Sequence, residues 1–126
     1  MQVLVDTSVW IDYFRGGGHS DKLDYLIDEN ILAINDLILA ELIPFLRLKN
    51  QRRLVALLGS VKKIALHIEW SQIMEYQYAC LKAGINGIGI PDLIIAQNAI
   101  QNRCELYSLD RHFILMKKNL KLSLLT

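Results

Sequence analysis

The sequence predicts an α/β domain in which a central parallel sheet of about five strands lies between two layers of helices. Short aliphatic runs of strand length alternate along the chain with longer segments whose apolar residues recur at helical spacing. The connections are short, and Gly, Pro, Asn or Asp stands at most of the boundaries. Strands that alternate with helices in this way form parallel sheets covered on both faces. We therefore expect residues 1–126 to form a single three-layer α/β/α domain.

The composition fits a folded domain of this kind. Apolar residues make up 52% of the 126 residues and charged residues 21%, which is ordinary for a globular protein. The formal net charge of +1 neither indicates nor excludes a nucleic-acid partner, because a local basic patch can lie within a balanced total. Cys80 and Cys104 lie in different expected elements without metal-ligand spacing, so we expect free thiols. No run reaches the length of a membrane span and no signal peptide is evident, which predicts a cytoplasmic protein.

The chain opens with a strand and two helices. The β-branched run at residues 2–5 is typical of a buried strand, and the short helix expected at 9–14 ends before three consecutive glycines. Ser20 or Asp21 suits the N-cap of the next helix, whose apolar residues between 23 and 27 recur at helical spacing.

A second strand and two further helices complete the first half. The apolar run at 31–34 predicts the strand, and Asn35 and Asp36 are cap candidates for a long amphipathic helix that reaches residue 48. Pro44 lies inside this helix and should kink or break it. Another helix is expected at 50–58, before a glycine.

The second half repeats the alternation. A strand with a basic outer face is expected at 61–67, and the helix at 69–83 ends at Gly84, a residue suited to the position after a helix. After a glycine-containing loop, Pro91 favours the first position of a helix that runs to about residue 102, with Asp92 in its first turn. The remaining expected elements are a strand at 105–108, a helix at 110–117 and a strand at 120–124.

Four of the thirteen acidic residues do not lie on plainly solvated helix faces. Asp6 ends the first strand, Asp92 follows the glycine-containing loop, and Asp110 follows the strand at 105–108. Glu41 stands within the almost wholly aliphatic run at 38–43. The carboxyl ends of parallel strands are where α/β proteins form ligand crevices. A carboxylate among aliphatic residues is also costly to bury unless its charge is compensated.

Helix capping is the alternative explanation. Asp6, Asp92 and Asp110 each stand where aspartate can cap or begin a helix, and Asp6 taken alone fits either role. Capping does not explain Glu41, which lies inside a helix, and it explains the four together poorly. A divalent cation would compensate several carboxylates at once. Mg²⁺ or Mn²⁺ suits oxygen ligands, whereas the scarcity of His and Cys argues against zinc.

Together these stretches resemble the PIN-domain nucleases, and among them the VapC-type toxins of bacterial type II toxin–antitoxin modules. The matching stretches are VDTSVWID at 5–12, LAEL at 39–42, GIPDLIIA at 89–96 and YSLDRHF at 107–113. They follow one another in order over nearly the whole chain. The resemblance implies a Mg²⁺- or Mn²⁺-dependent endoribonuclease that hydrolyses RNA phosphodiesters and leaves a 3′-hydroxyl and a 5′-phosphate.

The resemblance also implies roles for single residues. Its catalytic set is Asp6, Glu41, Asp92 and Asp110, with Asp6, Asp92 and Asp110 as metal ligands. Glu41 and Asp110 would complete the acidic cluster and orient the attacking water.

RNA contacts need cations and hydroxyls. The first candidates are Ser8, Arg15 and Arg111, followed by Thr7, Lys49, Arg52 and Arg53. Thr7 and Ser8 could equally cap the first helix. We expect Asp12, Asp36, His67 and His112 to be surface, capping or structural residues.

A VapB-type antitoxin and a homodimer are further implications of the resemblance. The apolar faces of 37–48 and 50–58 could form a groove for the antitoxin, or they could be ordinary core. Two other functions remain alternatives: a PIN-like module that binds RNA or protein without cutting it, and a response-regulator-like domain. The presence of all four acids disfavours the first. The lack of an acid pair at the first strand and of a lysine at a late strand end disfavours the second.

Overall fold

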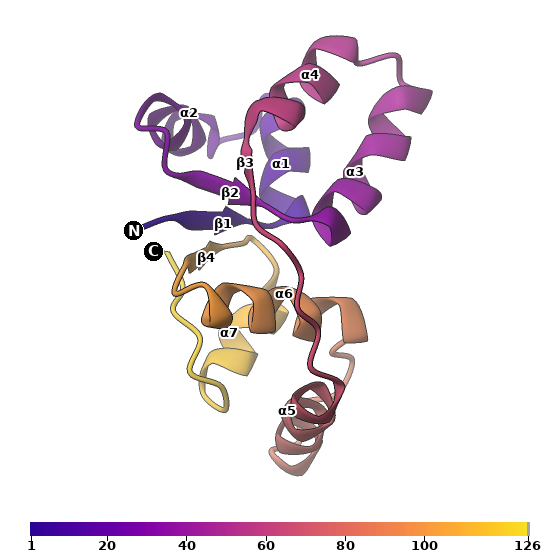
Figure 1. Ribbon diagram of the computed structural model, residues 1–126, viewed down its shortest axis with the longest axis vertical. Coiled ribbons are helices and arrows are strands. Elements are labelled where there is room, and N and C mark those ends of the chain that lie inside the picture. The colour runs from indigo at the N-terminus through magenta and orange to yellow at the C-terminus, as the bar shows by residue number, and fades with distance from the viewer. Residues whose placement is uncertain (126) are drawn as a thin grey trace.

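The chain folds around a parallel sheet, seen in a computed structural model that describes residues 1–125 (Figure 1). Over these residues the sheet has four strands: β1 (Val3–Val5), β2 (Leu32–Ile34), β3 (Lys62–Lys63) and β4 (Glu105–Tyr107). The helices are α1 (Thr7–Phe14), α2 (Ser20–Asp28), α3 (Asp36–Leu48), α4 (Arg52–Ser60), α5 (Trp70–Lys82), α6 (Ile90–Gln101) and α7 (Arg111–Lys117). The predicted three-layer α/β/α fold is thereby confirmed. Among residues 1–125, no helix combines the length and the apolar character needed to cross a lipid bilayer.

The strand order decides which helices cover which face. The order is β3-β2-β1-β4, with every pair parallel. The chain moves outward from β1 to β2 and β3, and then crosses back to β4 on the other side of β1. Right-handed crossovers in opposite directions place their helices on opposite faces. In Figure 1, α1 to α4 accordingly lie above β1 and β2, and α5 to α7 lie below.

The reversal of strand order lies between β1 and β4. Their register pairs Val5 with Tyr107, so the two strands end side by side. The backbone N–H of Asp6 donates to the carbonyl oxygen of Tyr107 at 2.9 Å, which carries the pairing one residue further. The carboxyl ends of two strands at such a reversal are the usual ligand site of an open α/β sheet.

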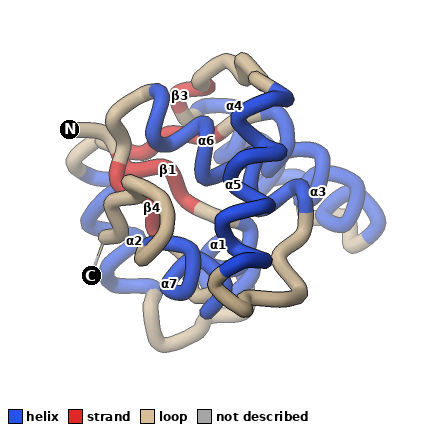
Figure 2. Tube along the Cα trace, turned by 90° about the horizontal axis from the view of Figure 1, so that it is seen from below, coloured by secondary structure: helices blue, strands red, loops and turns tan. Residues whose placement is uncertain are grey.

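A continuous apolar core holds this edge in place. Every residue of β1 and β2 is buried, and the helices that enclose the strands in Figure 2 add large side chains to the same core. Trp10 of α1 and Phe113 of α7 are at most 1% exposed. Each fully buried large apolar side chain contributes about 1.5–3 kcal/mol of transfer free energy. The residues that follow β1 and β4 are therefore attached to well-anchored helices.

The sheet is smaller than the sequence predicted. The last expected strand, at 120–124, is reduced to a single bridge between Leu124 and Leu106. The strand expected at 61–67 contains only two paired residues, because side chains of α6 bind the backbone that follows. Asn98 donates to the carbonyl oxygen of Ala65, and Gln101 donates to that of His67. The carbonyl oxygens of Ala65 and His67 are therefore hydrogen-bonded without a neighbouring strand.

The helix starts test the capping predictions. Asn35 caps α3 as predicted, because its Oδ1 accepts from the N–H of Ile38 at 2.9 Å. The predicted cap of α2 is wrong: His19 occupies the N-cap without a side-chain hydrogen bond, and Ser20 donates to the carbonyl of Gly17 instead. Pro44 was predicted to kink or break α3, and the helix continues through it without a break.

Candidate metal centre

Asp6 is buried at the carboxyl end of β1. Its side chain is 5% exposed and makes no cap hydrogen bond to α1, although it stands at the N-cap position. Instead, Oδ2 accepts hydrogen bonds from the hydroxyls of Ser8, at 2.9 Å, and Ser108, at 2.8 Å. The capping explanation therefore does not account for Asp6. Two hydroxyls fix its carboxylate and compensate part of its desolvation.

The same two serines join β1 to the loop after β4. The Oγ of Ser108 accepts from the backbone N–H of Asp110 at 3.0 Å while donating to Asp6. The Oγ of Ser8 accepts from the N–H of Leu109 at 3.0 Å. Ser8 thus bonds within the protein, and its predicted contact with RNA stays a prediction. Sequence reasoning missed Ser108, although a hydroxyl residue two positions before an acid at a strand end was the available signal.

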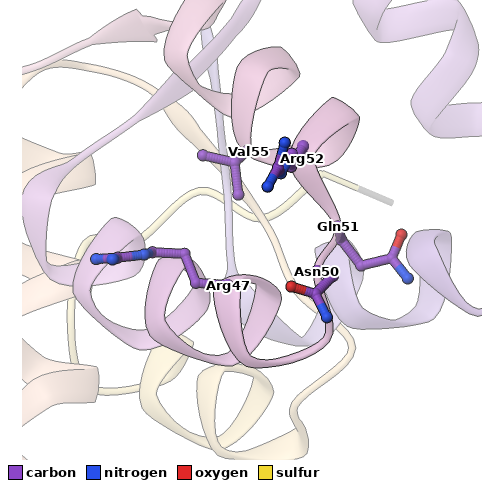
Figure 3. A pocket seen from close by; sticks show the side chains of 5 residues that line it. All are labelled: Arg47, Asn50, Gln51, Arg52 and Val55. Atoms are coloured by element: carbon purple, nitrogen blue, oxygen red, sulfur yellow. The ribbon is translucent and has the colours of Figure 1, made fainter.

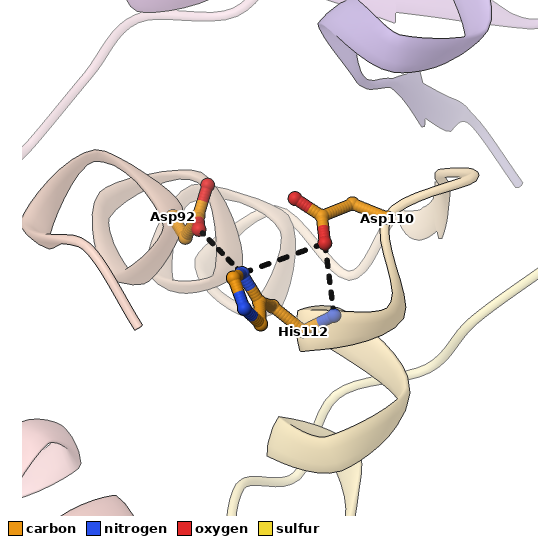
Figure 4. Close-up of side chains that lie close together, drawn as sticks. All are labelled: Asp92, Asp110 and His112. Atoms are coloured by element: carbon orange, nitrogen blue, oxygen red, sulfur yellow. Dashed lines mark hydrogen bonds and ion pairs between the residues drawn. The ribbon is translucent and has the colours of Figure 1, made fainter. Parts of the chain in front are cut away.

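Asp110 caps a helix and also lies close to Asp92 and His112. It is the N-cap of α7, and its Oδ1 accepts from the N–H of His112 at 2.9 Å. The same oxygen lies 3.5 Å from Nδ1 of His112, and that nitrogen lies 3.7 Å from Oδ2 of Asp92. Figure 4 shows the imidazole between the two carboxylates. One ligand atom from each of the three side chains lies within 4.8 Å of the others.

The pKa of Asp92 is affected by the other three acids. It is the third residue of α6, and its side chain is 25% exposed. Burial raises the pKa of Asp92 most, followed by the negative charges of Asp110 and Asp6, and then of Glu41, while His112 opposes the rise. Asp92 is therefore within electrostatic reach of each of the other three predicted site acids.

Glu41 lies differently from the prediction. It is exposed, so the expectation of a carboxylate embedded among aliphatic residues is wrong. Helix α3 turns Ile38 and Leu42 into the core, and Glu41 lies beside this buried stripe at its exposed border. A hydrogen bond of 2.8 Å from Thr7 Oγ1 to Glu41 Oε1 nevertheless ties it to the residue after Asp6. Thr7 holds Glu41 and does not cap α1.

The remaining candidates are spread around the edge of this cluster. Arg111 is exposed at the start of α7, next to Asp110. Arg15 is exposed beyond the far end of α1, about 12 Å from the start of that helix at 1.5 Å per residue. Asp36 pairs with Lys63 at 3.1 Å, in keeping with a surface role. The contacts of both arginines with RNA stay predictions.

The donor set of this cluster suits a hard divalent cation. Asp6, Asp92, Asp110 and Glu41 offer carboxylate oxygens from four separate segments, and His112 adds one imidazole nitrogen. Oxygen-rich sites are those that bind Mg²⁺ and Mn²⁺. A cation would also relieve the repulsion that raises the pKa of Asp92.

Comparison with known proteins identifies the family. The family model of the PIN domain matches residues 3–119. The chain belongs to the PIN domain family. The four acids of this PIN domain lie within the matched region. No curated protein sequence matches the chain.

Solved structures share the PIN fold over the full chain. The structure resembles a chain of VapBC2 from Rickettsia felis bound to a promoter DNA fragment, with a TM-score of 0.78 and 22% identity over 99% of this chain and 98% of that one. DNA-bound VapBC from Salmonella typhimurium gives a TM-score of 0.71 at 15% identity, covering 99% and 97%. FitAcB from Neisseria gonorrhoeae gives 0.67 at 17% identity, with the same coverage. At these identities the likeness shows the fold.

Proposed function

We propose that this PIN domain is a Mg²⁺- or Mn²⁺-dependent endoribonuclease and acts in the cytoplasm as the toxin of a type II toxin–antitoxin module. One observation carries the proposal: Asp6, Glu41, Asp92 and Asp110 converge from four segments, and the other three raise the pKa of Asp92. Carboxylates gathered at close range repel one another unless a cation joins them. Such an arrangement is typical of a functional site.

The four acids have two roles in this proposal. Asp92 and Asp110, half-buried and facing the same space, hold the cation together with Asp6. Among the described hydrogen bonds, those to Asp6 reach only Oδ2, which leaves Oδ1 for the cation. Glu41, positioned by Thr7, orients the attacking water. When bound, a divalent cation polarises the scissile phosphate and lowers the pKa of bound water, so no protein nucleophile is required.

RNA is proposed to cross this edge of the sheet. Arg111, exposed beside Asp110, would contact a phosphate next to the one that is cut. Arg15 lies beyond the other end of α1, where it would contact phosphates several nucleotides away. Hydrolysis assisted by the cation is proposed to leave a 3′-hydroxyl and a 5′-phosphate.

The antitoxin is proposed to dock between α3 and α4. A pocket of about 390 Å³ separates the end of α3 from the start of α4, lined by Arg47, Asn50, Gln51, Arg52 and Val55 (Figure 3). A second pocket, of about 140 Å³, lies beside Phe45 and Leu54. The side chain of Leu48 is 80% exposed, so these faces are not wholly core. A segment with apolar and acidic side chains suits this surface, and the similar solved structures include VapBC complexes.

Self-association is proposed through α5. Four large apolar side chains on this helix are more than half exposed: Trp70, Met74, Tyr78 and Leu81. Their spacing of three or four residues places them along one stripe of the helix. Apolar stripes of this kind are typical of protein interfaces.

The alternative is a PIN-like module that binds RNA without cutting it. Purified protein incubated with total RNA distinguishes the two. The nuclease gives fragments with Mg²⁺ or Mn²⁺ that disappear with EDTA and in Asp6→Asn. Retention of RNA without fragments, under every metal condition, would establish the binding module instead. Sequencing of RNA 5′ ends after expression in cells without antitoxin then identifies the target.

A further inference from the structure

His112 is the one nitrogen donor in the acidic cluster of residues 1–125. The sequence predicted a structural role for it, but its Nδ1 faces Asp110 Oδ1 at 3.5 Å and Asp92 Oδ2 at 3.7 Å (Figure 4). Charge-assisted hydrogen bonds between nitrogen and carboxylate are about 2.7–2.9 Å long. The imidazole therefore bonds tightly to neither carboxylate. It shares with both a space that one ion can occupy.

The position of the imidazole is set from several sides. The backbone N–H of His112 is bound to Asp110, and the next residue, Phe113, is anchored in the core at 1% exposure. On the other side of the ring lies Gly87, where an added Cβ would stand 3.9 Å from Nε2. The ring thus lies at the start of α7, beside the loop before α6, with Nδ1 toward the acids.

We propose that His112 supplies an imidazole ligand beside Asp92 and Asp110, and that this centre binds a divalent transition-metal ion such as Mn²⁺ in preference to Mg²⁺. The inference rests on the proposed metal-dependent function and deepens it. Mg²⁺ takes oxygen ligands almost exclusively, whereas imidazole is a ligand of first-row transition metals. A mixed set of carboxylates and one imidazole therefore discriminates between the two ions, whereas carboxylates alone would not.

The test uses Mn²⁺ as the probe and the full chain as the protein. Pulsed electron paramagnetic resonance of Mn²⁺-loaded protein should detect ¹⁴N modulation from a directly bound imidazole. His112→Ala and His112→Gln should abolish the modulation and lower the affinity for Mn²⁺ by at least about tenfold. Loss of a residue that only supports a metal ligand already lowers metal affinity by about tenfold or more. Mg²⁺ affinity should change much less. Exposed His67, outside the cluster, gives the matched control His67→Ala, which should keep the modulation.

The outcomes separate this inference from the proposed nuclease. Bound Mn²⁺ without ¹⁴N modulation, or equal losses of Mn²⁺ and Mg²⁺ affinity in both variants, overturns the role of His112 even if RNA is still cut. Modulation in a protein that cuts no RNA supports His112 and overturns the nuclease. A protein that binds neither ion overturns both. Circular dichroism of His112→Gln ensures that any loss is not a loss of folding.

Discussion

Two serine hydroxyls bind the carboxylate of Asp6, and that of Ser108 also binds the backbone of a second acid. It donates to Asp6 and accepts the N–H of Asp110, so one side chain couples two of the site acids. A hydrogen bond to a charged group contributes about 1.5–3 kcal/mol. Ser108 should therefore matter to the site without facing the substrate.

Ser108→Ala is expected to lower the rate of RNA cleavage by about 10- to 100-fold, because 1.4 kcal/mol corresponds to a factor of ten. The fold should be retained, since the hydroxyl lies at the edge of the core. Single-turnover rates at saturating Mn²⁺ measure the effect. Ser60→Ala, which removes a hydroxyl bonded to the carbonyl of Leu57 on α4, is the control and should leave the rate unchanged. An unaltered rate in Ser108→Ala would show that Asp6 needs no such support.

Asp92 makes the stability of the cation-free protein depend on pH. Burial and neighbouring acids raise its pKa above the ordinary value of 3.8, so the folded state binds this proton more tightly than the unfolded chain. The contribution of Asp92 to the free energy of unfolding therefore falls as pH rises from about 3.8 through the raised pKa. Asp92→Asn removes this penalty.

At neutral pH with EDTA, Asp92→Asn is expected to have a Tm at least as high as the wild type. Adding Mn²⁺ should raise the Tm of the wild type and leave that of the variant unchanged, because only the wild type binds the ion. Differential scanning fluorimetry measures both. A variant that melts well below the wild type in EDTA would mean that Asp92 serves the fold.

Sequence reasoning predicted that four acids gather in one place, but it did not predict their surroundings. Asp6 and Asp110 were predictable because strand ends and parallel pairing place them at one edge. The exposure of Glu41 was not, because an almost wholly aliphatic run gives no periodicity that distinguishes inward from outward faces. Ser108 and His112 make contacts across the fold, which residue type alone does not reveal.

At the scale of elements, α6 connects the two halves of the chain through buried amides. Asn98 Oδ1 accepts from Asn35 Nδ2 at 2.9 Å, and Asn98 Nδ2 donates to the carbonyl of Ala65 at 3.0 Å. The side chains of Asn35 and Asn98 are at most 2% exposed. The network fixes the start of α3, the chain after β3 and α6 relative to one another. Helix α6 is also the helix that carries Asp92.

Asn98→Ala is expected to destabilise the protein by about 1–3 kcal/mol for each buried group left without a partner. Urea unfolding followed by circular dichroism measures it. Gln101→Ala provides the matched control, because Gln101 makes one hydrogen bond from an exposed position on the same helix and should cost under about 0.5 kcal/mol. Equal midpoints for the two variants would contradict a structural role for the network.

Element boundaries were predictable where local chemistry determined them. Asn35 caps α3, and α5 ends just before Gly84, whose φ of +79° suits glycine. The strands after Val61 and near Leu124 were overpredicted, because side-chain bonds from α6 and the sheet's own edge decide how far pairing extends. The extent of strand pairing depends on the assembled sheet, so the local sequence does not predict it.

At the scale of the whole molecule, α5 presents the apolar stripe of Trp70, Met74, Tyr78 and Leu81. Met74→Glu is expected to shift the protein from dimer to monomer at micromolar concentration, because a charge in an apolar interface is costly to desolvate. Sedimentation velocity measures the change. Tyr25→Glu alters a side chain on α2 that is 60% exposed, against 67% for Met74, and should leave the oligomeric state unchanged. A wild type that sediments as a monomer would exclude this interface.

The layered fold followed from alternation alone, and the comparisons place the chain in the PIN domain family over residues 3–119. We propose that the acids at the carboxyl ends of β1 and β4, together with Asp92 of α6, form a metal-dependent centre that cuts RNA. The most direct measurement is cleavage of a 5′-labelled single-stranded RNA by the wild type and Asp92→Asn, each titrated with Mn²⁺. The account predicts cation-dependent fragments from the wild type and none from a folded Asp92→Asn. Equal cleavage by both proteins would contradict it.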